Sequence, residues 1–188
     1  MHDGPMRIAV VLGGGARVWD DVFAARAFYQ RHGLEPVWFA ANDMIEHFPA
    51  PIAAVTLHPA KLNQWLAARR QRGYPMPAQV YAHVGADSRQ YPNVNITHRL
   101  KDWGGSVGMF GYIVARHLGL DRVLLCGVPM NSDNHFVHNA SWTAVKAFTR
   151  PWEAHRDEML PYVRSMSGGW TEQLFGTPDA AWLSTAAI

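Results

Sequence analysis

The sequence predicts an α/β fold in which strands and helices alternate along most of the chain. Residues Arg7–Leu12 form a nearly continuous apolar run that ends in three glycines, as expected of a strand buried on both faces. The segment Trp103–Met130 contains a glycine-rich turn, an amphipathic helix and a second buried strand. Short links join the other apolar segments. Because such alternation forms parallel sheets with right-handed crossovers, we expect a Rossmann-like three-layer sandwich with a mostly parallel sheet.

The first half of the chain contains the predicted strands that follow Arg7–Leu12. Between the first two, Asp20 or Asp21 is suited to cap a helix that Gly33 ends. A second helix is expected before Gly73, because apolar residues recur at helical spacing. The further strands are predicted at Pro36–Ala41, Ile52–Leu57 and Gln79–Val84, with a short fifth strand at Val94–Thr97.

The central block of the chain carries the strongest pattern. The predicted helix Ser106–Leu118 places its apolar residues on one face. Its Gly108 and Gly111 lower helix propensity, so we expect their backbone to lie close to a sheet or a ligand. Gly119 ends this helix, and the buried strand Arg122–Val128 follows directly.

The C-terminal segment, about 139–188, is predicted to be helical and rich in aromatic residues. Apolar residues recur at helical spacing on both sides of Pro151, which either kinks one helix or begins a second. A short helix is expected at Thr171–Phe175. With a core at about 7–138, the 188 residues fit one domain, 1–188.

Composition narrows the function classes. The net charge is only +2 and most of the 17 basic residues are scattered, which argues against nucleic-acid binding. The tightest basic cluster, Arg69, Arg70 and Arg72, lies where a predicted helix ends, and cations are favourable at that end of a helix. Cys126 is the only cysteine and lies in an apolar strand, which favours a buried, unreactive thiol. No apolar run reaches the length of a membrane span and no signal-peptide pattern begins the chain. We therefore expect a cytoplasmic protein without membrane contact; a homodimer stays open.

Polar and glycine-rich segments follow several predicted strands. Because ligands of parallel α/β sheets bind beyond the carboxyl ends of the strands, these segments define a candidate site. The segments are Gly13–Gly15 with Arg17, Asn42–Asp43, Thr56 with His58, Gly104–Ser106 and Pro129–His138.

Two glycine turns are candidates for binding phosphate. Gly13, Gly14 and Gly15 offer bare backbone amides and Arg17 a guanidinium, although neither a Walker A loop nor a GxGxxG pattern is present. Gly105 and Ser106 open a helix, where the hydroxyl either caps the helix or contributes to an anion site. The alternative for each segment is a plain tight turn or cap.

The loop Met130–His138 is the densest polar segment. His135 is a candidate general base oriented by Asp133, and Asn131 and His138 are candidate substrate contacts. His135 and His138 also have the HxxH spacing of some metal sites, so a divalent ion stays open, as does a merely exposed loop.

Two residues at other strand ends have both a structural and a functional interpretation. Asn42 either caps the next helix or binds a base or ribose, and His58 either packs beside Pro59 or contacts the substrate.

The block GGSVGMFGYIVARHLGLDRVLLCGVPM resembles the motility-accessory-factor/hydroxymethylpterin-pyrophosphokinase-like family, which is related to bacterial sialyltransferases that use a nucleotide-sugar donor. GGGARVW stands where that family has a small-residue loop similar to NGPSL. The resemblance implies that Asn42, the Gly105–Ser106 turn and His135 match family positions. It covers about Arg7–His138, and only Trp103–Met130 is specific. The features TLHPxKLxxWLxxR and VRSMSG are also similar to uncharacterised bacteriophage and prophage proteins.

These observations favour a small transferase that uses a nucleotide, a nucleotide sugar or another phosphorylated donor. In this hypothesis both glycine turns and Arg17 hold the phosphates, Asn42 contacts the base or ribose, and His135 deprotonates the acceptor. A non-catalytic nucleotide-binding or sequestering module is the first alternative. A metal-dependent phosphohydrolase that uses Asp133, His135 and His138 is the second.

Overall fold

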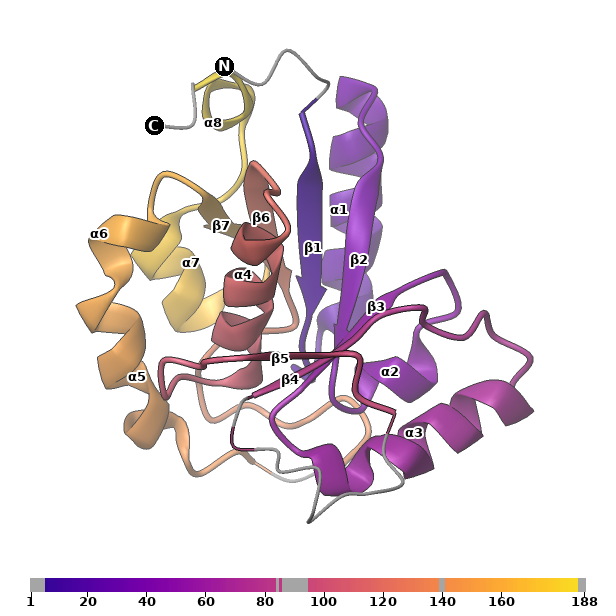
Figure 1. Ribbon diagram of the computed structural model, residues 1–188. Helices are drawn as coiled ribbons and strands as arrows, with labels where there is room; N and C mark the ends of the chain where they lie inside the picture. Colours follow the sequence, from indigo (N-terminus) through magenta and orange to yellow (C-terminus); the bar gives the residue numbers. More distant parts are fainter. Residues whose placement is uncertain (1–5, 84, 86–94, 139–140, 186–188) are drawn as a thin grey trace.

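The computed structural model describes residues 6–83, 85, 95–138 and 141–185 (Figure 1). Seven strands form one sheet in the order β5-β4-β3-β2-β1-β6-β7, and every strand pair is parallel. The strands are β1 (Ile8–Leu12), β2 (Pro36–Ala41), β3 (Ala53–Thr56), β4 (Val80–His83), β5 (His98–Leu100), β6 (Arg122–Cys126) and β7 (Val163–Ser165). The predicted Rossmann-like α/β class is confirmed.

Helices pack on both faces of the sheet and complete the three layers. One face is covered by α1 (Val18–His32), α2 (Met44–His47), α3 (Pro59–Gln71) and α8 (Ala180–Ser184). The opposite face is covered by α4 (Val107–His117), α5 (Val145–Ala154), α6 (Arg156–Met159) and α7 (Gly169–Phe175). None of the helices in the described ranges is long and apolar enough to cross a membrane.

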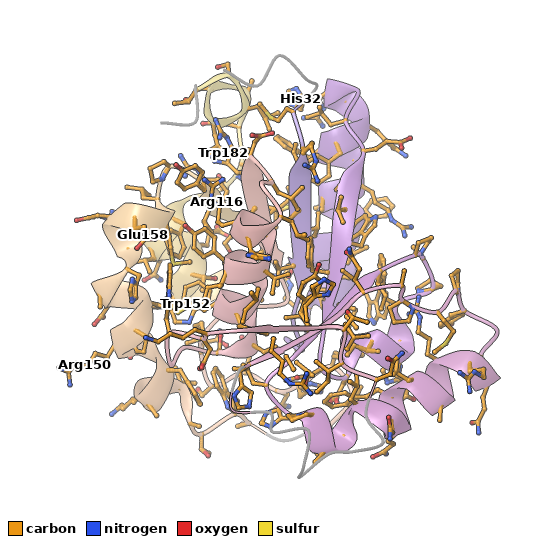
Figure 2. The ribbon with its side chains drawn as sticks, in the orientation of Figure 1. His32, Arg116, Arg150, Trp152, Glu158 and Trp182 are labelled. Carbon is orange, nitrogen blue, oxygen red and sulfur yellow. The ribbon has the colours of Figure 1, made fainter. Side chains whose placement is uncertain are left out.

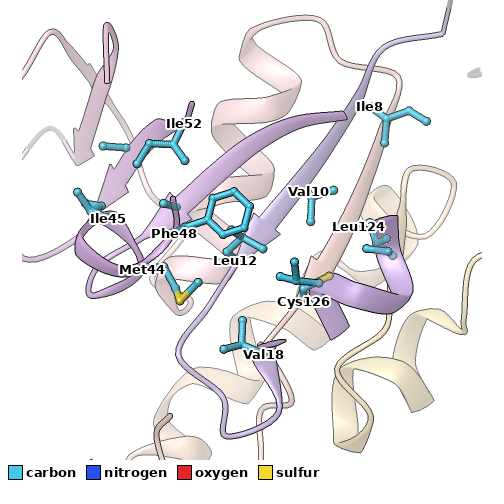
Figure 3. Close-up of a cluster of buried hydrophobic side chains, with 14 of the residues drawn as sticks. Ile8, Val10, Leu12, Val18, Met44, Ile45, Phe48, Ile52, Leu124 and Cys126 are labelled. Carbon is cyan, nitrogen blue, oxygen red and sulfur yellow. The ribbon is translucent and has the colours of Figure 1, made fainter. Parts of the chain in front are cut away.

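The alternation of side chains along β1 divides the core in two. Ile8, Val10 and Leu12 face the layer of α1, where they pack with residues such as Val18 and Cys126 (Figure 3). Ala9 and Val11 face the layer of α4. All five residues of β1 are buried, so the strand is central to both clusters. Burial also raises the pKa of the Cys126 thiol well above its ordinary value, which keeps it protonated.

Gly111 of α4 allows this helix to lie directly against the sheet. A Cβ atom at Gly111 would stand only 2.6 Å from Cγ1 of Val11 on β1. We expect Gly111→Ala to destabilise the protein by about 1–3 kcal/mol through overpacking, despite the better helix propensity of alanine.

The test of the Gly111 prediction is a double-mutant cycle with Val11→Ala, measured by urea denaturation. Val11→Ala removes the atoms that the new methyl group would meet, so the Gly111→Ala penalty should shrink in that background. Equal penalties in the two backgrounds would contradict close packing between helix and strand.

The structure departs from several predicted boundaries. Helix α1 begins at Val18 with Arg17 as its N-cap, so neither Asp20 nor Asp21 caps it. Instead the buried Asp21 accepts a hydrogen bond from the N–H of Gly127 at 2.8 Å, linking α1 to the loop after β6.

The fifth strand lies at His98–Leu100, directly after its predicted position at Val94–Thr97. Val84, which ends the predicted fourth strand, and Val94, which begins the predicted fifth, lie outside the described residues. Strand β7 and helix α8 were not predicted.

The C-terminal segment is largely helical, as predicted, but it forms several short helices that pack on the sheet and it adds a strand. Pro151 lies inside α5, and Trp152 points from this helix into the core whereas Arg150 points outward (Figure 2). The guanidinium of Arg122 donates hydrogen bonds to the carbonyls of Trp182 and Thr185, which ties α8 to the sheet.

Candidate functional site

A cavity of about 590 Å³ lies beyond the carboxyl ends of the strands. Strands β2 to β5 continue from one side of β1, whereas β6 and β7 lie on the other side, so the strand order reverses at the β1–β6 pair. The loops after β1 and β6 both line the cavity. Ligands of open α/β sheets bind at such a reversal, so this cavity is the candidate site.

Most of the residues predicted from the sequence meet in this cavity. The lining includes Gly13, Gly14, Gly15, Asn42, His58, Ser106, Asn131, Asp133, His135 and His138. Thr56 and Gly104 of the candidate segments do not line it, nor do two residues that were given a binding role, Gly105 and Arg17. Gly105 precedes Ser106 without contributing to the wall, and the exposed Arg17 pairs with Asp20 at 3.6 Å beside a second, small cavity.

The first glycine loop, Gly13–Gly15, packs closely against the loop after β6. The N–H groups of Gly13 and Gly15 donate to the carbonyls of Cys126 and Gly127, so two of the three predicted phosphate-binding amides are already used. A Cβ atom at Gly14 would stand 2.2 Å from Nε2 of His135. Glycine is therefore required here for the close approach of an imidazole.

The second glycine turn offers free polar groups. Ser106 is the N-cap of α4, but its side chain makes no capping hydrogen bond, and its Oγ is buried without a partner among the described residues. Val107, Gly108 and Met109 begin the helix, and the first N–H groups of a helix lack intrahelical acceptors. The start of α4 is therefore suited to an anion.

A carboxylate and two imidazoles form a cluster on the cavity wall. Oδ2 of Asp43 lies 3.4 Å from Nε2 of His135 and 3.9 Å from Nε2 of His138, and the two imidazoles stack. The N–H of Val137 donates to Nδ1 of His135 at 3.1 Å. In the neutral ring the proton of His135 is therefore on Nε2, facing Asp43.

The carboxylate beside His135 is thus Asp43, whereas the sequence favoured Asp133. Asp133 accepts a hydrogen bond from Nδ2 of Asn131 at 2.6 Å, and its own N–H donates to Oδ1 of Asn131. This pair stabilises the turn of the loop. Because Asp43 follows β2 and His135 follows β6, only the fold reveals their proximity.

Asn42 is held by the neighbouring strand and does not cap a helix. Its Oδ1 accepts a hydrogen bond from the hydroxyl of Thr56 at 2.9 Å, and this hydroxyl accepts one from the N–H of His58. Asn42 and Met130 both have φ of +51°, and they are the non-glycine residues with positive φ in the described part of the chain. Both line the cavity, where such strain often accompanies function.

Aromatic and aliphatic side chains form a further part of the wall, and none of them was assigned to the site from the sequence. Trp142 and Phe148 stack with ring centroids 5.6 Å apart, and Leu57 and Trp65 also line the cavity. The C-terminal segment therefore closes part of the site. Lys61, on the first turn of α3, was also missed; it contributes a cation.

The environment of His135 leads to a prediction for its titration. Partial burial lowers the pKa of His135 below 6.5, the charge of Asp43 opposes this, and His138 adds to it. Asp43→Asn should therefore lower this pKa further, whereas His138→Gln should raise it toward 6.5. The measurement is an NMR titration of the His135 Cε1–H in chelator-treated protein; shifts in the same direction would contradict the described cluster.

No protein-family model, curated protein or solved structure matches the chain, and its function is therefore inferred from the fold and the site geometry.

Proposed function

We propose that the protein is a small transferase whose donor is a nucleotide, a nucleotide sugar or another phosphorylated small molecule. The observation that carries this proposal is the unpartnered hydroxyl of Ser106 at the start of α4, on the wall of a cavity at the strand-order reversal. A buried hydroxyl without a partner is costly, and rotation of the Ser106 side chain toward the cavity would give it a phosphate oxygen as acceptor.

The cavity has two chemically different parts, which suits a donor with a charged and a less polar end. The N-terminus of α4 and the ammonium of Lys61 supply positive charge for the phosphate. The aromatic rings of Trp142 and Phe148 supply a flat, apolar wall. Small-molecule sites commonly combine apolar walls with a few convergent polar groups.

The acceptor hydroxyl transfers its proton to a carboxylate oxygen of Asp43, because Nδ1 of His135 already accepts the Val137 N–H and Nε2 carries the ring proton. The sequence hypothesis gives this role to His135, which instead supports Asp43. Partial burial keeps the pKa of His135 below its ordinary value, so the ring is neutral at physiological pH. Its Nδ1 accepts the Val137 N–H, which fixes the ring beside Asp43. Positioning of the two substrates and stabilisation of the phosphate leaving group would supply most of the rate enhancement.

The first experiment is a thermal-shift and calorimetric titration with nucleoside monophosphates, nucleoside diphosphates and nucleotide sugars. Saturating ligand should raise the melting temperature, because it binds only the folded state. Ser106→Ala and Lys61→Met should each weaken binding about 10-fold or more, since each removes a hydrogen bond to a charged group. Lys146→Met is the matched control, because Lys146 is exposed on α5 and does not line the cavity.

Absence of binding by all these compounds, or equal affinities of the Lys61→Met and Lys146→Met variants, would overturn the proposed phosphate site. Tight binding without turnover of any activated donor would instead support the non-catalytic module. Transfer of a group from the donor to an acceptor other than water in the wild type, lost in Asp43→Asn with nucleotide affinity retained, would support the transferase; hydrolysis alone would support the phosphohydrolase.

A further inference from the structure

The cluster of Asp43, His135 and His138 has the composition and the spacing of a metal site. Each residue offers one ligand atom, and the three atoms lie within 4.8 Å of one another. They come from two loops, because Asp43 follows β2 and the two histidines follow β6. We propose that these three residues bind a divalent transition-metal ion of the zinc class. Binding of the ion itself does not depend on the proposed donor.

The two distances from the Asp43 carboxylate are close to those of a four-coordinate ion. Zinc–nitrogen and zinc–oxygen bonds are about 2.0–2.1 Å long, which places the ligand atoms of a tetrahedral site about 3.4 Å apart. Asp43 Oδ2 lies 3.4 Å from one imidazole nitrogen and 3.9 Å from the other. A small movement of the exposed His138 ring would complete the triangle. Two imidazole ligands favour a transition metal over Mg²⁺ or Ca²⁺, which prefer oxygen.

The loop after β6 holds His135 in place for this role. Its ring lies against the backbone of Gly14, and the N–H of Phe136 donates to the Gly14 carbonyl at 2.9 Å. Binding of a metal by Nε2 requires the ring proton to move to Nδ1, so the hydrogen bond from the Val137 N–H must break. The proposal therefore predicts a change in the amide environment of Val137, a residue that does not itself contact the ion.

The charges of the cavity also favour a cation at this position. Among the described lining residues, the carboxylates of Asp43 and Asp133 accompany a single ammonium, that of Lys61. An ion held by three protein ligands keeps a fourth position open toward the cavity. In a transferase this position would bind the acceptor hydroxyl and lower its pKa. Only this last consequence depends on the proposed function.

The test is calorimetric titration of chelator-treated protein with Zn²⁺ at pH 7.5, with Co²⁺ as a spectroscopic probe of the coordination number. We expect one ion per chain with a Kd in the micromolar range or below, and a visible Co²⁺ spectrum typical of four ligands. Asp43→Asn and His138→Gln should each weaken zinc binding by about 10–100-fold or more, because loss of an outer-shell partner alone already costs that much. The exposure of His138 makes His138→Gln compatible with folding, and the melting temperature checks this.

The matched control is His155→Gln. His155 lies 3.4 Å from Glu158 and stacks on Trp103, so it forms a comparable histidine–carboxylate pair outside the cavity. Its loss should leave zinc affinity unchanged. A wild-type Kd weaker than about 1 mM, or equal affinities of wild type and His138→Gln, would overturn the site. Because no nucleotide is present, this outcome is independent of the phosphate-binding experiment.

Discussion

Replacement of Arg69 by alanine is expected to destabilise the protein by about 3–5 kcal/mol, because it removes a large buried side chain and leaves four backbone carbonyls without their donor. Arg69 is completely buried. Its guanidinium donates to the backbone carbonyls of Ile45, Phe48, Ala50 and Pro75 at 2.6–2.9 Å. Alanine would leave a cavity and these carbonyls without their donor, because the side chain holds the end of the short helix α2 against α3.

Urea denaturation of Arg69→Ala and of Arg70→Ala measures this effect. Arg70 is the adjacent residue of the same helix, but its side chain is exposed, so its loss should change stability by less than about 0.5 kcal/mol. Arg69→Lys should recover little, since an ammonium cannot reach carbonyls on several sides as the planar guanidinium does. Similar stabilities of the Arg69→Ala and Arg70→Ala variants would show that the carbonyl contacts contribute nothing.

Asp21→Asn is expected to stabilise the protein at pH 7–8 by up to about 3 kcal/mol, since one pKa unit corresponds to about 1.36 kcal/mol. Burial raises the pKa of Asp21 from 3.8 to about 6, although the hydrogen bond from the Gly127 N–H opposes the shift. Asparagine keeps an acceptor for that N–H and carries no charge to desolvate. The folded state binds a proton more tightly than the unfolded state, so stability falls as the pH rises from about 4 through about 6.

The difference between variant and wild type should therefore be largest above pH 7 and vanish below about pH 4. Denaturation with urea at intervals between pH 4 and pH 8 follows it. The control is Asp157→Asn, because Asp157 is exposed on α6, on the opposite face of the sheet from Asp21, and pairs with Arg156 at the surface. A difference independent of pH for Asp21→Asn would mean that a changed contact, and not the buried charge, determines the stability.

The central part of the fold could be predicted because its strands are apolar on both faces. Strands β1 and β6 are uniformly buried, and such runs need no partner information to be recognised. Strand β7 has three residues, and β5 contains the exposed His98 and Arg99. Edge strands of this length carry too little apolar pattern, so their positions depend on pairing with the neighbouring strand.

The sequence predicts which strand ends contribute residues to the site, but not which of those side chains contact one another. The polar loop after β6 does line the cavity, yet the carboxylate beside His135 comes from the loop after β2, a contact between residues 92 positions apart in the sequence. Lys61 was missed because it looks like an ordinary solvent-facing residue of α3. Ser106 is a good capping residue by type, and only the structure shows that its hydroxyl is unused.

The contact between the first glycine loop and His135 has a consequence for how this sequence can change over evolutionary time. The imidazole takes the volume that any side chain at Gly14 would need. Residues 14 and 135 are therefore expected to covary: a descendant with alanine or serine at position 14 should carry a smaller residue than histidine at position 135. Such a lineage would also lose one imidazole of the Asp43 cluster. Relaxed selection at position 14 should therefore be accompanied by relaxed selection at position 135.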